Sequence, residues 1–153
     1  MEIFGAGPFS NEHGLHFLDR FAREPVRQRR QILERIFFQV QDRPYLLGWT
    51  FFPEEVVAAA AIVAACLPGS ESTRQELAHF GYEPEAILPD GADPELSASA
   101  LKALLLAAGQ NGPWHATRTS PDDAARARQT TDHLAAVFRS EAHGQDQELP
   151  LQF

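Results

Sequence analysis

The stretch VVAAAAIVAACL, residues 56–67, decides the fold of this chain. Pro53 fits the first turn of a helix, where its missing N–H costs nothing, and the two glutamates after it complement the positive end of the helix dipole. The dipeptide Pro-Gly at 68–69 then ends the helix. Because the run is apolar on every side, it predicts a central helix surrounded by other helices. Twelve apolar residues are too few to cross a bilayer core of about 30 Å.

The rest of the chain shows helical periodicity and no segment with convincing strand alternation. We therefore expect an all-α fold, a compact single-domain bundle of about five to six helices around the central Ala-rich helix at about residues 53–67. The domain is expected to span residues 1–140, and residues 141–153 are expected to form a loose C-terminal tail. The predicted helices cover about residues 12–23, 25–42, 53–67, 73–80, 94–108 and 120–140, with a loop at 82–93.

Composition and charge exclude several classes of protein. The chain has 153 residues, with 21 acidic against 13 basic residues and a net charge of −8. That balance argues against a protein that mainly coats nucleic acid or anionic lipid. A single cysteine excludes an internal disulfide framework, and with no export signal at the start the cytoplasm is the expected compartment. No phosphate-binding loop, dinucleotide fingerprint or serine-hydrolase motif is present, so no cofactor is expected.

The opening FGAGPFSNEHGLHFL, residues 4–18, resembles a bacterial family known as domain of unknown function 4259. Members of that family begin with an aromatic-Gly-x-Gly-x-Phe-x-Asn-Asp pattern, and an acidic start to an Ala-rich helix is also typical, as at residues 54–67 here. The resemblance implies a small, mostly helical bacterial protein and assigns no activity. The chain departs from the usual residues of the pattern at Phe4, Glu12, His16 and Phe17.

The sharpest local cluster of ligand-type side chains is Glu12-His13-x-x-His16. Residues three apart are neighbours on a helix, so His13 and His16 can share a metal ion with Glu12 or Asp19 nearby. A catalytic zinc needs a third protein ligand, which folding would have to bring in from His79, His115 or His133. The plainer interpretation is a pair of polar first-turn residues that face solvent.

Charge is distributed unevenly along the chain. Residues 1–50 carry seven cations and six acids, whereas residues 51–153 carry six cations and fifteen acids. The second predicted helix is rich in arginine, which suggests a phosphate-contacting patch, but a solvated helix face explains the same pattern. An acidic surface that steers a basic partner is predicted at Glu83, Glu85, Asp90, Asp93 and Glu95.

Three functions are compatible with these patterns. The first is a non-enzymatic module that binds another protein with a basic surface, as an immunity or antitoxin-like protein does. The second is a small metal-dependent enzyme that uses His13 and His16. The third is nucleic-acid contact through the Arg-rich second helix. The oligomeric state does not follow from the sequence.

Overall fold

The computed structural model describes residues 5–50, 52–109, 114 and 120–148, with side chains as far as residue 142. Helices make up the secondary structure of these residues, with no strand among them, so the all-α prediction is confirmed. None of these helices is long and apolar enough to span a membrane. The elements are α1 (Glu12–Arg23), α2 (Val26–Asp42), the 3-10 turn η1 (Pro44–Leu46), α3 (Pro53–Ala64), α4 (Glu71–His79), α5 (Pro84–Ile87), α6 (Pro94–Ala108) and α7 (Pro121–Glu148).

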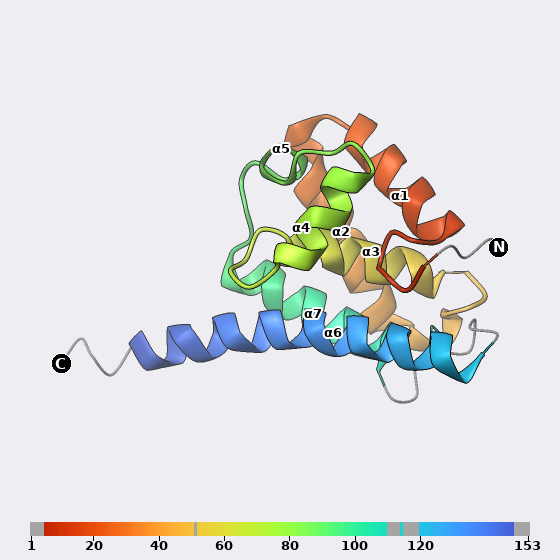
Figure 1. The fold of residues 1–153 in the computed structure, drawn as a ribbon. Coiled ribbons are helices and arrows are strands. Elements are labelled where there is room, and N and C mark those ends of the chain that lie inside the picture. Colours follow the sequence, from red (N-terminus) through yellow and green to blue (C-terminus); the bar gives the residue numbers. More distant parts are fainter. Residues whose placement is uncertain (1–4, 51, 110–113, 115–119, 149–153) are drawn as a thin grey trace.

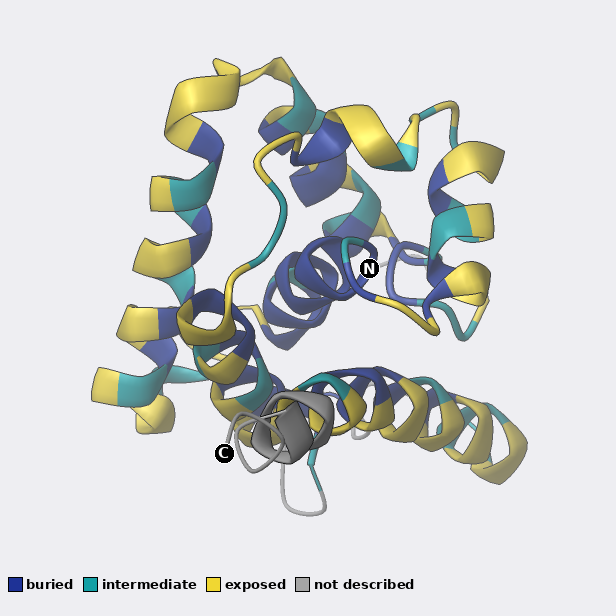
Figure 2. Ribbon diagram, turned by 90° about the vertical axis from the view of Figure 1, so that its left-hand side faces the viewer, coloured by how far each residue is buried: buried dark blue, intermediate teal, exposed yellow. Residues whose placement is uncertain are grey.

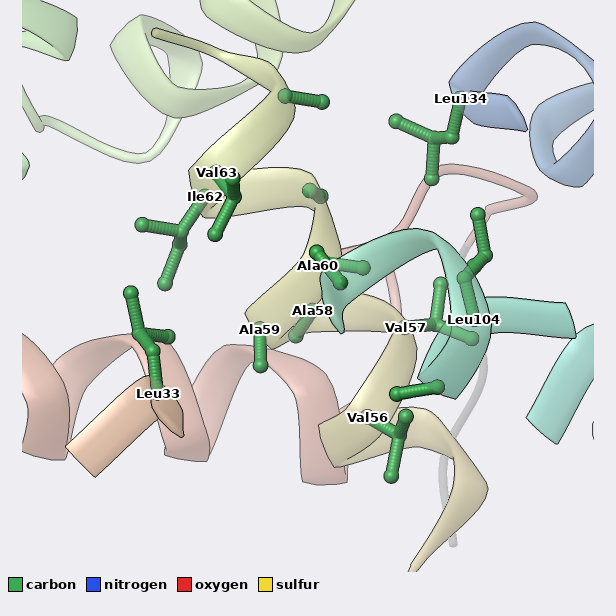
Figure 3. Packing of buried hydrophobic residues seen from close by; sticks show 14 of the residues in the cluster. Leu33, Val56, Val57, Ala58, Ala59, Ala60, Ile62, Val63, Leu104 and Leu134 are labelled. Carbon is green, nitrogen blue, oxygen red and sulfur yellow. The ribbon is translucent and has the colours of Figure 1, made fainter. Parts of the chain in front are cut away.

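Helix α3 is the centre of the fold, as the apolar run predicts. Every residue of α3 except Glu55 is buried, and the helix packs against α6, α1, α7 and α2. Figure 2 shows it as a buried rod with helices on all sides, each exposing its outer face. In Figure 3, Leu33 of α2, Leu104 of α6 and Leu134 of α7 surround it. A helix enclosed in this way has no amphipathic stripe, because each of its faces is an interior face.

Alanine is the residue that lets four helices approach α3 closely. The side chains of Ala58, Ala59, Ala60, Ala61 and Ala64 are all fully buried. A methyl group occupies so little volume that neighbouring helix axes come close together without opening voids. The consequence of this arrangement is that the core has no room for a larger side chain at these positions.

The variant Ala60→Leu tests that packing. We expect it to lower the free energy of unfolding by about 1–3 kcal/mol, because the added methylenes force neighbouring side chains or helices to shift. Urea denaturation followed by circular dichroism measures the change. The exposed Ala78 of α4 supplies the control, since Ala78→Leu should stay within about 0.5 kcal/mol of the parent protein. Equal stability of the two variants would show that α3 is loosely packed.

Side-chain caps set the beginnings of three helices where polar residues precede an apolar run. Asn11 Oδ1 accepts a hydrogen bond from the Gly14 N–H at 2.6 Å, and Asp93 Oδ1 accepts one from the Leu96 N–H at 2.8 Å. Ser120 Oγ accepts a hydrogen bond from the Asp123 N–H of α7 at 3.1 Å. These are N-cap bonds, which satisfy donors that the first helical turn leaves open.

Several predicted boundaries are wrong by part of a helix. Helix α3 ends at Ala64 rather than near residue 67, because the chain tightens there into a turn in which the Leu67 N–H bonds the Ala64 carbonyl. The predicted loop at 82–93 contains the one-turn helix α5, and η1 follows α2 without a signal that we recognised. Helix α7 continues to Glu148, well past residue 140, and its C-terminal turns reach beyond the other helices (Figure 1). The division into a domain and a loose tail stays a prediction, and residues 149–153 lie outside the described part.

Arg29 joins three helices at the edge of the core. Its Nε donates to the Glu24 carbonyl at 3.1 Å, and Nη2 donates to the Ala22 carbonyl at 2.8 Å, both at the end of α1. Its Nη1 donates to the carbonyls of Ala86 and Ile87 in α5, at 3.0 and 2.9 Å. The guanidinium therefore satisfies carbonyl groups that helix ends leave without partners.

Candidate functional site

The Gly/Pro loop at residues 5–11 is held between α4 and α7. The Phe9 N–H and the Ser10 hydroxyl both donate to Glu76 Oε1 of α4, each at 2.9 Å. On the other side, the Thr130 hydroxyl of α7 donates to the Ala6 carbonyl at 2.8 Å. Figure 1 shows the loop above α7, close to the start of α1. Bonds to both helices fix the loop, although it has no regular secondary structure of its own.

Close approach of neighbouring groups favours glycine at positions 7 and 14. A Cβ atom on Gly7 would overlap the Glu76 carboxylate, and one on Gly14 would lie 2.6 Å from the Pro8 carbonyl oxygen. Glycine is the residue that permits such contacts between the backbone and its neighbours. The sequence pattern marks Gly14 as a helix residue of low propensity, and the contact with Pro8 explains why it stands there.

The variant Gly14→Ala tests this contact. Helix propensity alone predicts that alanine stabilises an interior position by roughly 1 kcal/mol. We expect the opposite sign, a loss of about 1–3 kcal/mol, because overpacking against the Pro8 carbonyl forces the loop away from α1. Urea denaturation distinguishes the two signs directly, and a stabilised variant would contradict the packing described here.

The loop, α4 and α7 line an open cleft of about 360 Å³. Glu76 lies in it, and burial raises the pKa of its carboxyl group, while the hydrogen bonds from Ser10 and Phe9 act in the opposite direction. Helix α7 contributes side chains at spacings of three and four, which share one face of a helix. The cleft is lined by Ala6, Gly7, Pro8, Ser72, Thr73, Glu76, Arg126, Gln129, Thr130, His133 and Leu134.

The predicted metal ligands lie at the start of α1. His16 and Glu12 are exposed, whereas the His13 ring stacks on Phe52, with 4.2 Å between ring centroids and 13° between planes. Within the described residues, no group of three His, Cys, Asp or Glu side chains is placed to hold a metal ion. The predicted third ligand His115 lies outside those residues, so the metal site at Glu12, His13 and His16 stays a prediction.

The cysteine is a half-buried thiol. Cys66 follows α3, and its Sγ lies 3.6 Å from the Ile62 carbonyl oxygen. Burial raises the pKa of the thiol to about 11. At neutral pH the thiol is therefore protonated, and a protonated thiol is a poor nucleophile.

The predicted acidic surface is partly neutralised within the protein. Arg74 of α4 forms an ion pair with Glu85, and Arg30 of α2 forms one with Asp93 at 2.7 Å. The bond from the Leu96 N–H and the pairing with Arg30 hold the pKa of Asp93 below its usual range. The remaining acids of the set, Glu83, Asp90 and Glu95, are exposed and form no ion pair within the described residues. Their role toward a basic partner stays a prediction.

The Arg-rich second helix presents fewer cations to solvent than its sequence indicates. Arg29 is buried under its four carbonyl contacts. Arg30 is engaged by Glu34 at 2.7 Å as well as by Asp93. Arg27 and Arg35 are exposed. Of the arginines that suggest a phosphate-contacting patch, Arg29 therefore joins three helices, and Arg30 is paired with acids at the surface.

Sequence reasoning missed an exposed aromatic surface. We use the term aromatic surface for Phe38, Tyr45, Trp49 and Phe52, which are 66%, 72%, 86% and 43% exposed. They lie within fifteen residues of chain, on the end of α2, on η1, in the following turn and at the start of α3. η1 packs against α2, and the Trp49 N–H bonds the Leu46 carbonyl, which ties the turn to η1.

A signal for this surface exists in the sequence. Tyr45 and Trp49 sit beside Pro44 and Gly48, and Gly48 has a φ of 87°, so the segment turns sharply. An aromatic residue in a tight turn has no helix face through which it can be buried. By contrast, the second tryptophan, Trp114, is fully buried in the core.

Comparison with known proteins places most of the chain in one family. No curated protein and no solved structure matched it. A family model described as a domain of unknown function, DUF4259, matches residues 3–111. The match includes the Gly/Pro loop, α1 to α6 and the aromatic surface, and it ends before α7. The resemblance seen in the opening residues is thereby confirmed, and the chain belongs to the DUF4259 family.

Proposed function

We propose that this protein is a non-enzymatic module that binds another protein through the aromatic surface. The single observation that carries the proposal is the exposure of four aromatic side chains, Phe38, Tyr45, Trp49 and Phe52, which lie within fifteen residues of one another. The other large apolar side chains exposed in the described structure, Val26, Leu105 and Leu106, are aliphatic. Tryptophan and tyrosine are the residues most enriched among those that dominate binding energy at protein interfaces. Exposed apolar groups that gather on a folded domain indicate a site of interaction, and these four side chains are close together in sequence.

The partner should present apolar side chains bordered by carboxylates. Arg35 stands one helical turn before Phe38, and Arg43 stands two residues before Tyr45; both arginines are exposed. Arg43 has one weak acidic neighbour, Asp42 at 3.6 Å. Arginine at the rim of an aromatic surface favours an acidic partner through long-range steering and charge-assisted hydrogen bonds. This chemistry differs from that of the basic partner expected for the acidic surface.

Single-stranded nucleic acid is the competing ligand for such a surface, because bases also stack on exposed aromatic rings. Protein is favoured because few free arginines surround the rings. Arg29 is buried under its carbonyl contacts, and Arg30 is paired at the surface with Glu34 and Asp93. Binding to a phosphate backbone depends on several cations acting together.

A selection of displayed random peptides on the immobilised protein tests the proposal. We expect the enriched sequences to combine aromatic or aliphatic residues with Asp and Glu, and to lose binding on a protein that carries Tyr45→Ala and Trp49→Ala. The matched control is a protein that carries Glu83→Gln, Asp90→Asn and Glu95→Gln, which should retain the same peptides. All five positions are exposed, so neither protein should lose its fold.

Three outcomes would overturn the proposal. One is the absence of any enriched sequence. Another is enrichment of Lys- and Arg-rich peptides that the acidic-surface variant no longer binds, which would assign the partner to Glu83, Asp90 and Glu95. The third is salt-sensitive binding of a single-stranded deoxyoligonucleotide that requires Trp49, which would assign the surface to nucleic acid.

A further inference from the structure

The cleft behind the Gly/Pro loop has walls that are fixed before any ligand arrives. Glu76 holds one side of the loop through the Phe9 N–H and the Ser10 hydroxyl, and Thr130 holds the other side. The Asn11 cap joins the end of the loop to α1. A site whose walls are already ordered binds a small ligand without having to order them first, which removes one cost of binding.

Opposite charges face the same small space. Among the residues that line the cleft, Glu76 supplies a carboxylate from α4, and Arg126 supplies a guanidinium from α7. Both hydrogen bonds described for Glu76 go to Oε1, and Oε2 lies against Gly7, which also lines the cleft. Burial raises the pKa of Glu76 because its carboxylate has lost water, and a ligand ammonium group would restore the missing stabilisation.

The remaining lining suits a compact ligand with an apolar body. Ala6, Pro8 and Leu134 supply apolar surface, and His133 lies two turns along α7 from Arg126, on the same face. The volume of about 360 Å³ is at the small end of the range for ligand pockets, roughly 300–1,000 Å³. It matches a molecule the size of a free amino acid rather than a nucleotide or a long chain.

We propose that this cleft binds a small zwitterion of the α-amino acid class, with its ammonium group on Glu76 and its carboxylate on Arg126. The two charged groups set the orientation of the ligand, and its side chain lies against the apolar lining. This site is separate from the aromatic surface and does not depend on the function proposed for that surface.

Titration of the protein with standard free L-amino acids, one at a time at millimolar concentration, tests the proposal by two-dimensional amide NMR. We expect at least one apolar amino acid to shift amide signals of the loop and of the cleft-facing turns of α4 and α7. For that ligand, two analogues that keep the side chain are compared, one without the amino group and one without the carboxylate. Each should bind at least about tenfold more weakly, because each lacks one charge-assisted hydrogen bond.

Two variants assign the two charges. Glu76→Gln keeps an acceptor for the loop and should reduce amino acid binding to the level of the analogue without the amino group. Arg126→Gln, at an exposed position, should reduce it to the level of the analogue without the carboxylate. Arg128→Gln lies outside the cleft and should change nothing, and Trp49→Ala should also leave binding intact.

The proposal is overturned if no amino acid shifts those signals. It is equally overturned if the analogues bind as well as the parent amino acid, or if Arg126→Gln leaves the affinity unchanged. The result for Arg126→Gln does not depend on the loop, since that side chain is exposed and forms no hydrogen bond to the loop in the described structure.

Discussion

The variant Arg29→Met is expected to lower the free energy of unfolding by roughly 3–5 kcal/mol. Methionine fills part of the same space and offers no donor, so four carbonyl groups lose their partner at once. A hydrogen bond to a charged group contributes about 1.5–3 kcal/mol, and a buried acceptor left open adds its own desolvation cost. The guanidinium also lies 5.8 Å from the Phe21 ring centroid, a contact that methionine replaces without its charge.

Two further variants separate the loss of the Arg29 hydrogen bonds from a general effect of removing charge. Arg27→Met, at an exposed position of the same helix, should stay within about 0.5 kcal/mol of the parent protein. The stability of Arg29→Lys should lie between those of Arg27→Met and Arg29→Met. An ammonium group cannot reach carbonyls on two helices in the way that the planar guanidinium group does. Urea denaturation followed by circular dichroism measures all three. Similar stabilities for Arg27→Met and Arg29→Met would show that α1 and α5 do not depend on Arg29.

The fold could be predicted where local chemistry and global packing agree. The all-round apolar character of residues 56–67 indicates an enclosed helix, and α3 is that helix. Asn11 and Ser120 cap the helices that they precede, because a cap is a contact between near neighbours in sequence. Such features need no knowledge of what lies across the core.

The features that could not be predicted depend on contacts between distant residues. Nothing in the sequence near Arg29 indicates that its partners lie at Ala86 and Ile87, 57 and 58 residues later. The one-turn helix α5 could not be predicted for the same reason, since its carbonyl groups are satisfied by that arginine. The helical pattern around Arg29 indicates a solvent-facing arginine, although the residue is only 9% exposed.

The candidate sites also combine features that the sequence indicates with contacts between distant residues that it does not. The Gly/Pro loop can be identified from sequence, but its partner Glu76 lies 67 residues from Phe9 and has no motif around it. Two members of the acidic surface form ion pairs with Arg74 and Arg30, which linear charge counting cannot detect. Hydrophobicity predicts that aromatic side chains are buried, so it could not predict the aromatic surface. A turn cannot bury every side chain that it carries.

The variant Trp49→Ala is expected to have the largest effect on function. Trp49 is the most exposed of the large apolar side chains in the described structure, and truncating an aromatic anchor at the centre of an interface costs about 2–4 kcal/mol of binding free energy. That loss corresponds to an affinity at least about thirtyfold weaker. Stability should change little, because an exposed side chain in a turn contributes little to packing.

The most direct test of protein binding by the aromatic surface is isothermal titration calorimetry with a selected acidic, apolar peptide. The titration is carried out on the parent protein, on Trp49→Ala, and on the protein that carries Glu83→Gln, Asp90→Asn and Glu95→Gln. We expect Trp49→Ala to weaken binding at least about thirtyfold and the acidic-surface variant to bind as the parent does. Equal affinities of the parent and Trp49→Ala, with binding lost in the acidic-surface variant, would contradict the proposal.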